Sequence, residues 1–309
     1  MRRTRTPRSK IVGQSSSDKL TPNHPDWATL LAEAVNTPGV ISQAYSRFWN
    51  YSVGNQLLAM IQCIVRGIEP GPIHTFKGWR DLGRHVKKGQ KAITLCMPVK
   101  VKRKAKVLKS DLPTVPGGDG TTQQLNSPDG TKPGDGKSMT SIVFVYKPRW
   151  FVLSQTDGAE YVPTEMPEWS EVRALRALEI DRVRFDHPNG NCQGYAIKRR
   201  VAVSPIAGLP HKTLFHELAH IVIGHTEEAD KLDDHELTPM NLREVEAECV
   251  ALICCESLSL PGIPECRGYI QTWLGKETIP DRSAQRIFRA ADQILGSGRP
   301  SALRPAESE

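Results

Sequence analysis

The segment from Thr213 to His225, TLFHELAHIVIGH, contains the pattern H-E-x-x-H. His216 and His220 are four residues apart, so on a helix both side chains leave the same face and can bind one metal ion. Glu217 follows the first histidine, where its carboxylate can take a proton from a metal-bound water. The pattern therefore predicts a hydrolytic metal site, in preference to two unrelated histidines on a surface helix.

The residues around this pattern predict the helix that positions it. Pro210 stands just before the pattern, and Gly224 follows where a helix would end. Apolar residues recur at helical spacing on the opposite face, which we expect to pack on a core. These apolar residues are Leu214, Leu218, Ile221 and Val222.

A catalytic zinc site needs a third protein ligand and one open position. The downstream run REVEAECVALIC, residues 243–254, predicts a second helix. Glu244 and Glu248 are four apart and share a face, whereas Glu246 points elsewhere. We predict that Zn²⁺ is bound by the two histidines and Glu244. Glu248, one turn further on, would accept a hydrogen bond from a ligand histidine and fix its tautomer.

Four other residues remain open as the third ligand. Glu246 and Glu248 lie on the same predicted helix, and His225 and His235 lie between the two helices. His225 falls one residue short of the spacing H-E-x-x-H-x-x-G-x-x-H. Without the upstream histidines, these glutamates would be interpreted as a solvated helix face.

Composition excludes several classes of protein. The 309 residues suffice for two ordinary domains, and 39% apolar content is typical of a globular protein with some disordered parts. No run approaches the roughly 20 apolar residues that span a membrane, and no apolar segment follows the basic N-terminus as a secretory signal requires. The seven cysteines contain no C-x-x-C pair, which favours a reduced, cytoplasmic protein.

Charge is divided unevenly along the chain. Residues 1–110 contain 20 Lys and Arg against 5 Asp and Glu, whereas the remainder contains 21 against 29. The formal charge of the whole chain is +7. A basic first part joined to a mildly acidic second part predicts a polyanion partner for the first.

The basic excess is concentrated in the run FKGWRDLGRHVKKGQKAI, residues 76–93, where aromatic side chains alternate with cations. Cations that follow a backbone and aromatic faces that stack on bases are typical of single-strand binding. For Trp79, burial in the core is the alternative. The predicted DNA-binding residues are Lys77, Trp79, Arg80, Arg84, Lys87, Lys88 and Lys91.

The chain predicts an α+β protein in four parts. Residues 1–20 are expected to be a disordered basic arm, and residues 296–309 a disordered tail. Residues 21–165 are expected to form an α+β nucleic-acid-binding domain with a flexible insertion at 103–140. It begins with a helix from Asp26 and a longer helix over residues 42–65. Residues 166–295 are expected to form a second, mainly helical domain.

The sequence resembles ArdC-type antirestriction proteins over most of residues 25–290. In the first domain the resemblance rests on Asn55-Gln-Leu-Leu with Gln62, on Phe76-Lys-Gly-Trp-Arg and the residues after it, and on Phe151-Val-Leu-Ser-Gln-Thr. In the second it rests on Thr213-Leu-x-His-Glu-Leu-Ala-His and Glu244-Val-Glu-Ala-Glu. It implies an N-terminal single-stranded-DNA-binding domain followed by a zincin-like, gluzincin-type metallopeptidase domain.

The resemblance implies a protein that protects an incoming mobile element, such as a plasmid, from restriction. Glu217 would be the general base of a zinc-dependent hydrolase, and its substrate a repressor or a restriction-related protein. Two alternatives remain. The metal could be structural in a pure DNA-binding protein, or the enzyme could be a regulatory protease that cleaves a repressor. The intact Glu217 favours an enzyme, because a structural site needs ligands and no base.

Overall fold

The computed structural model describes residues 26–103, 139–188, 190–226, 239–275 and 277–300. Three helices open the described chain: α1 (Trp27–Asn36), α2 (Val40–Phe48) and α3 (Val53–Arg66). The predicted start at Asp26 is confirmed, because its side chain accepts a hydrogen bond from the backbone N–H of Ala28 at the helix N-terminus. The single helix predicted for residues 42–65 is instead two helices, broken between Phe48 and Val53.

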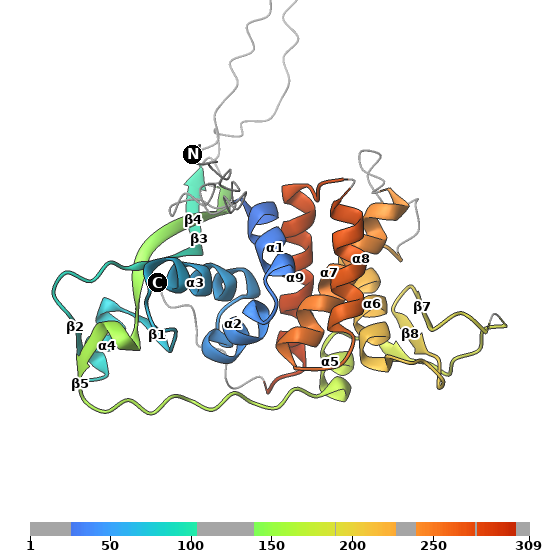
Figure 1. Ribbon diagram of the computed structural model, residues 1–309, viewed down its shortest axis with the longest axis horizontal. Helices are drawn as coiled ribbons and strands as arrows, with labels where there is room; N and C mark the ends of the chain where they lie inside the picture. The colour runs from blue at the N-terminus through green and yellow to red at the C-terminus, as the bar shows by residue number, and fades with distance from the viewer. Residues whose placement is uncertain (1–25, 104–138, 189, 227–238, 276, 301–309) are drawn as a thin grey trace, which may run out of the picture. The chain divides into compact units, whose positions relative to one another are not determined.

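A small mixed region follows the three helices along the chain (Figure 1). Its elements are β1 (Ile73–Thr75), α4 (Phe76–Asp81), β2 (Arg84–Val86), β3 (Ile93–Arg103), β4 (Met139–Val152) and β5 (Thr156–Gly158). Strand β4 lies between β1 and β3 in one sheet, and β2 pairs with β5 in another. Both β1 with β4 and β2 with β5 are antiparallel pairs, with Ile73 opposite Val152.

The C-terminal region is mainly helical. Helix α5 (Glu171–Ala177) leads into a three-stranded sheet of β6 (Asp181–Arg182), β7 (Gly194–Ile197) and β8 (Arg200–Val203). Strand β8 lies in the middle, parallel to β6 and antiparallel to β7. Four longer helices complete the chain: α6 (Pro210–Ile223), α7 (Met240–Ser257), α8 (Ile263–Leu274) and α9 (Asp281–Ser297). A mixed α/β protein with a helical C-terminal region is thus confirmed.

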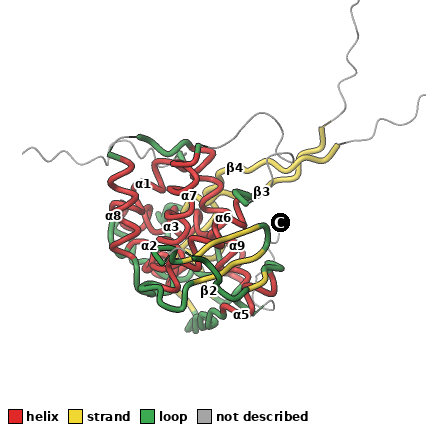
Figure 2. Tube along the Cα trace, turned by 90° about the vertical axis from the view of Figure 1, so that its right-hand side faces the viewer, coloured by secondary structure: helices red, strands yellow, loops and turns green. Residues whose placement is uncertain are grey.

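Helix α7 is the centre of the helical core. It packs against α6, α8, α9 and α2, and Figures 1 and 2 show these helices gathered side by side. Every residue of α7 from Val245 to Ser257 is buried. A helix surrounded on all sides is apolar around most of its circumference, so the polar groups that it does carry need partners inside the protein.

Each of the first three helices begins at a carboxylate that belongs to a C-terminal helix. Asp281 accepts from the backbone N–H of Ala28, Glu256 from that of Gly39, and Asp292 from that of Val53. A carboxylate at a helix N-terminus binds the unpaired N–H groups and stabilises the helix dipole. These contacts join α1, α2 and α3 to α7 and α9.

The chain divides into two compact units. One unit takes in the chain up to Leu95 and from Pro148 onward, and the other is Cys96–Lys147, which holds the outer parts of β3 and β4. The boundary at residue 165 stays a prediction. The basic arm, residues 1–20, and residues 104–138 of the insertion lie outside the described residues. Helix α9 continues to Ser297 and the described chain to Pro300, past the expected start of the tail.

All seven cysteines are free thiols. Six are buried, and Cys192 is half-buried. Burial raises the pKa of the Cys63 thiol to about 11 and that of Cys255 to about 12, so these groups stay protonated and unreactive at neutral pH. Among the described helices, none combines the length and the apolar run that crossing a bilayer requires.

Candidate metal centre and basic surface

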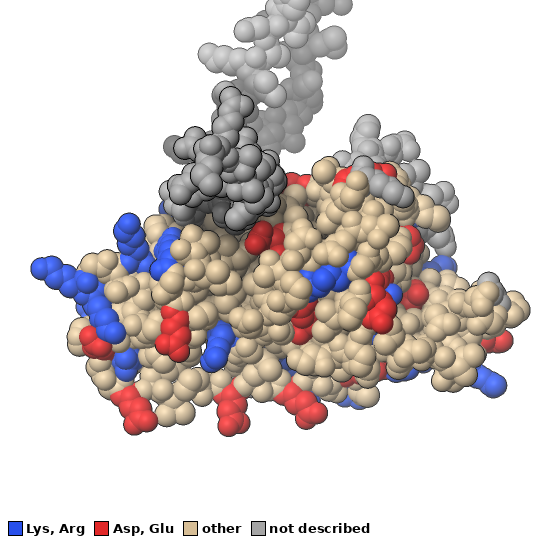
Figure 3. Space-filling model, in the orientation of Figure 1, with Lys and Arg blue, Asp and Glu red and all other residues tan. Residues whose placement is uncertain are grey.

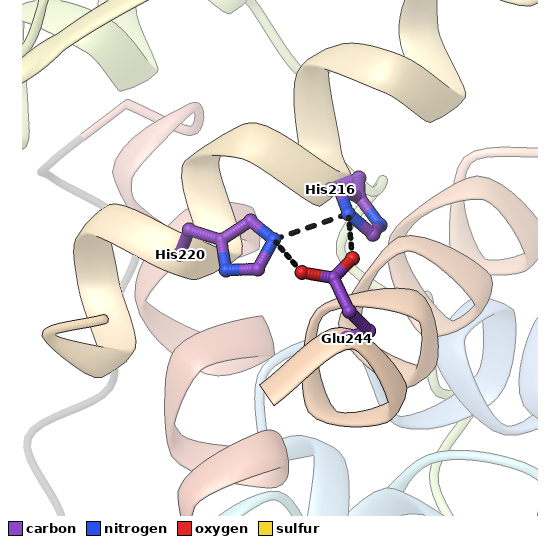
Figure 4. A group of neighbouring side chains, drawn as sticks. All are labelled: His216, His220 and Glu244. Atoms are coloured by element: carbon purple, nitrogen blue, oxygen red, sulfur yellow. Dashed lines mark hydrogen bonds and ion pairs between the residues drawn. The ribbon is translucent and has the colours of Figure 1, made fainter. Parts of the chain in front are cut away.

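Helix α6 presents His216 and His220 on one face, as their spacing predicts. Pro210 is its first residue, and Gly224 ends it in the left-handed conformation with φ of 94°. The Nε2 atoms of the two histidines are 3.1 Å apart. Figure 4 shows both rings turned toward each other and toward a carboxylate of the neighbouring helix.

That carboxylate belongs to Glu244, in the first turns of α7. Its Oε2 lies 3.3 Å from His216 Nε2, and its Oε1 lies 3.7 Å from His220 Nε2. One ligand atom from each of the three residues lies within 4.8 Å of the others, and no second such group occurs in the described parts of the chain. Two imidazoles and one carboxylate are a donor set that zinc and other divalent ions take. The Glu244 side chain is 42% exposed, which leaves one side of the group open to solvent.

Glu248 lies one turn behind Glu244, where the sequence places it. Its Oε2 is 2.9 Å from His216 Nδ1, and its Oε1 accepts from Lys212 Nζ at 2.8 Å. Burial raises the pKa of Glu248, but the hydrogen bonds with His216 and Lys212 outweigh it and lower the pKa to about 2. A permanently charged carboxylate therefore holds the ring of His216.

Three of the other candidate ligands point away from this group. Glu248 is bound to the far nitrogen of His216, and Glu246 is bound to His225 Nε2 at 2.9 Å. His225 in turn approaches His220 through its Nδ1 and lies behind the ring. His235 lies outside the described residues.

The two histidines differ in their affinity for protons. Burial lowers the pKa of His216, yet hydrogen bonds with Glu244 and Glu248 raise it to about 9. Burial and the charge of His216 lower the pKa of His220 to about 4. The two histidines together therefore carry one positive charge, on the His216 ring, which is bound to Glu244 and Glu248. A divalent cation bound here would take the place of that proton, since a ligand imidazole must be unprotonated.

Glu217 stands beside the two histidines without joining the group. Burial raises its pKa to about 7, with the charge of His216 acting against the shift and that of Glu244 adding to it. A carboxyl group that titrates near neutral pH suits a general base. Strand β7 passes close by: a Cβ added to Gly194 would lie 3.2 Å from Glu217 Cγ and 2.5 Å from Thr213 Cγ2. Glycine at position 194 therefore lets the strand run against the base.

The residues predicted to bind DNA separate into two groups. Lys77, Arg80, Lys88 and Lys91 are exposed on α4 and the loops around β2. Arg84 and Lys87 bind the protein itself. The guanidinium of Arg84 donates to Thr156 Oγ1 and to carbonyl groups of β5 and Ala159, and Lys87 pairs with Asp157 at 3.4 Å. In Figure 3, Lys and Arg side chains gather over the region of α4, β2 and β5, with a few acidic ones among them.

Trp79 is not available to a nucleic acid. Its side chain is 0% exposed, its indole N–H donates to the Phe151 carbonyl at 2.7 Å, and its ring contacts those of His74 and Tyr161. This burial contradicts the stacking role predicted for Trp79 and confirms the core alternative. The spacing of apolar residues could not distinguish a buried Trp79 from one that stacks on a base, because α4 is only six residues long.

The exposed aromatic residue is Phe76, which the sequence pattern contained but did not single out. Its side chain is 55% exposed beside Lys77, with one edge toward Phe151. Phe76 is the first residue of α4, three residues before Trp79, so it was the other aromatic candidate for stacking in this segment.

Among solved structures, crystal structures of the antirestriction protein ArdC from plasmid R388 are similar to this chain. The Mn(II)-bound form is 19% identical with a TM-score of 0.49, and covers 88% of this chain and 96% of its own. The metal-free form is 20% identical with a TM-score of 0.47, and the coverage is 88% and 93%. No curated protein matches the chain in sequence.

The chain thus carries an H-E-x-x-H pattern in its helical C-terminal region and a mixed region with a basic surface before it (Figure 3). Residues 19–144 match the family described as the N-terminal domain of anti-restriction factor ArdC. This match over the N-terminal part of the chain agrees with the resemblance to ArdC-type antirestriction proteins that the sequence predicts.

Proposed function

We propose that this protein is a DNA-binding antirestriction protein that also carries a hydrolytic metal centre of the zinc metallopeptidase type. The observation that carries the second part is the convergence of His216, His220 and Glu244 beside a half-buried Glu217. A structural site needs no such base, so the arrangement favours an enzyme. The C-terminal region would then be a zincin-like domain, with α6 and α7 supplying the site and β6, β7 and β8 beside it.

The residues would divide the chemistry as follows. A Zn²⁺ held by the two histidines and Glu244 would act as a Lewis acid and make a water nucleophilic at neutral pH. Glu217 would accept a proton from the attacking water and return it to the leaving amine of the substrate. Glu248 would keep the His216 ring in one orientation through the 2.9 Å hydrogen bond at Nδ1.

Strand β7 supports a peptide as the substrate. It is an edge strand of its sheet, so one row of its backbone groups has no strand partner among the described residues. An extended peptide can add to such an edge through backbone hydrogen bonds. Because Gly194 of β7 lies against Glu217, a peptide bound along this strand would pass the base. A repressor or a restriction-related protein is the substrate class that we propose.

We assign DNA binding to the exposed cationic residues of α4 and of the loops around β2. Lys77, Arg80, Lys88 and Lys91 would contact phosphates, and Phe76 would take the stacking role that burial denies to Trp79. Arg84 and Lys87 would shape the surface through their bonds to β5 and to the 3₁₀ turn before it, Leu153–Gln155. Free thiols and the DNA partner together favour the cytoplasm.

DNA binding should depend on this surface in a way that salt reveals. The Lys88→Glu, Lys91→Glu double variant of the full chain is expected to bind single-stranded DNA more weakly by a similar factor for every sequence. The plot of log affinity against log salt should become shallower by roughly 0.7 for each phosphate that the variant no longer neutralises.

Phe76→Ala should lose about 1–3 kcal/mol of binding free energy if the ring stacks on a base. Fluorescence anisotropy with labelled oligonucleotides measures both.

The matched control is the double variant Arg176→Glu, Arg289→Glu, which makes the same change in net charge at exposed sites on α5 and α9. It should keep most of the affinity. Equal weakening by the two double variants would show that net charge alone draws the DNA, and the assignment to α4 and β2 would be abandoned.

Metal analysis tests the hydrolytic centre. The purified protein, loaded with Zn²⁺ or Mn²⁺ in turn and dialysed, should retain about one ion per chain, as one three-ligand site implies. The preferred ion should support cleavage of unfolded polypeptides, followed by mass spectrometry, and a chelator should stop it. Stoichiometric metal without any cleavage would favour the structural alternative.

A further inference from the structure

We propose that His225 and Glu246 form a positioning relay that fixes the orientation and tautomer of His220. The relay rests on the proposed metal site, because it acts on one of the ligands of that site. Its members are a half-buried imidazole behind the His220 ring and a fully buried carboxylate behind that imidazole. Neither residue is a ligand in this assignment.

The end of helix α6 places His225 behind His220. Gly224 adopts the left-handed conformation, and the backbone N–H of His225 donates to the His220 carbonyl at 2.8 Å. This reversal of the chain is the Schellman arrangement of a helix C-terminus. It turns His225 back onto the last turn, so that a residue five positions on reaches the ring of His220.

With His225 carrying a single ring proton, the hydrogen bonds of the relay define one arrangement of protons. His220 Nδ1 lies 3.0 Å from His225 Nδ1, and His225 Nε2 lies 2.9 Å from Glu246 Oε2. An ionised carboxylate only accepts, so the proton of a neutral His225 is on Nε2 and its Nδ1 is an acceptor. His220 Nδ1–H must then donate to it. The lone pair of His220 is left on Nε2, which faces His216 and Glu244.

Glu246 is held as an anion by two further contacts. Its side chain is 0% exposed, and Arg286 Nη2 donates to Oε1 at 2.6 Å. Ser283 forms a second side-chain hydrogen bond with this carboxylate. A buried charge with such partners is costly to remove or to leave unpaired, so it is a firm anchor for the ring.

The relay is the counterpart of the shorter connection behind His216. There a carboxylate, Glu248, touches the ligand ring directly and is itself bound to Lys212. Behind His220 an extra imidazole separates the ring from its carboxylate, and Arg286 takes the place of the lysine. Behind each ligand ring there is therefore a carboxylate of α7 that is itself paired with a cation.

The test is the affinity of the full chain for Zn²⁺, measured by competition with a chromophoric chelator. His225→Phe keeps a ring of similar size but offers His220 no acceptor, and should weaken Zn²⁺ binding by about 10- to 100-fold. His225→Gln offers a carbonyl acceptor and an N–H donor, and should recover most of that loss. His211→Phe, an exposed histidine on the same helix, is the matched control and should leave the affinity unchanged.

Thermal unfolding of the metal-free variants separates positioning from folding. The proposal requires that His225→Phe and His225→Gln melt within a few degrees of each other while their Zn²⁺ affinities differ. Should His225→Phe fail to fold, Glu246→Gln takes its place, and it should weaken Zn²⁺ binding with the stoichiometry unchanged. Wild-type affinity in the variants that fold would overturn the relay, and complete loss of stoichiometric binding would instead make His225 a ligand. A wild type without metal would overturn the proposed site itself.

Discussion

Glu217→Gln is expected to keep one divalent ion per chain and to lose about 10²- to 10⁴-fold in the rate of peptide hydrolysis. The amide is nearly the same size as the carboxylate but cannot accept the proton of the attacking water. The three ligand atoms belong to other residues, so the metal site stays complete. Metal content by mass spectrometry and cleavage of an unfolded substrate measure the two halves of this prediction.

Removing a ligand should give the opposite result. His216→Ala and Glu244→Ala are each expected to lose stoichiometric metal, and hydrolysis with it, because two ligands remain. His211→Ala on α6 and Glu265→Ala on α8 are exposed matched controls that should keep both. Tight stoichiometric binding by Glu244→Ala would show that another residue is the third ligand.

The same variants separate hydrolysis from protection against restriction. If antirestriction rests on DNA binding alone, Glu217→Gln should protect incoming DNA as well as the wild type, and the Lys88→Glu, Lys91→Glu variant should not. If proteolysis is required, Glu217→Gln should lose protection as well. Transfer of a plasmid into a restricting host is the measurement.

Arg267→Met is expected to lower the free energy of unfolding by about 3–5 kcal/mol, because it leaves a buried carboxylate without its cation. Arg267 on α8 pairs with Glu256 on α7, and both side chains are almost fully buried. The same guanidinium donates to the carbonyl groups of Ala34 and Val35 near the end of α1. Glu256 also accepts from the Gly39 N–H at 2.8 Å, so the variant weakens the attachment of α1 and α2 together.

Urea unfolding of the full chain measures this loss. Arg289→Met on α9, where the side chain is exposed, is the control and should change the free energy by less than about 0.5 kcal/mol. The double variant Arg267→Met, Glu256→Gln should be less destabilised than the sum of the two single changes, since no unpaired charge is left inside. A loss below about 1 kcal/mol for Arg267→Met would mean that the pair does not hold these helices together.

The sequence determined the parts of the site that depend on local spacing. The interval between His216 and His220 and the placing of Pro210 and Gly224 predict helix α6 and its polar face, and both are present. Likewise the interval between Glu244 and Glu248 predicts two carboxylates on one face of α7, and both reach His216. These inferences hold because helical geometry links residues three to four apart, whatever the rest of the chain does.

The tertiary structure decided the features whose partners are distant in sequence. The break between α2 and α3 is one example, because the Val53 N–H that begins α3 is bound by Asp292, 239 residues further on. Trp79 is another, since its ring enters the core through contacts with β4 and Tyr161. The hydrogen bonds of Glu246 with His225 and Arg286 likewise depend on the packing of α6, α7 and α9. Spacing along one helix cannot encode such contacts, because they depend on which helices meet and at what register.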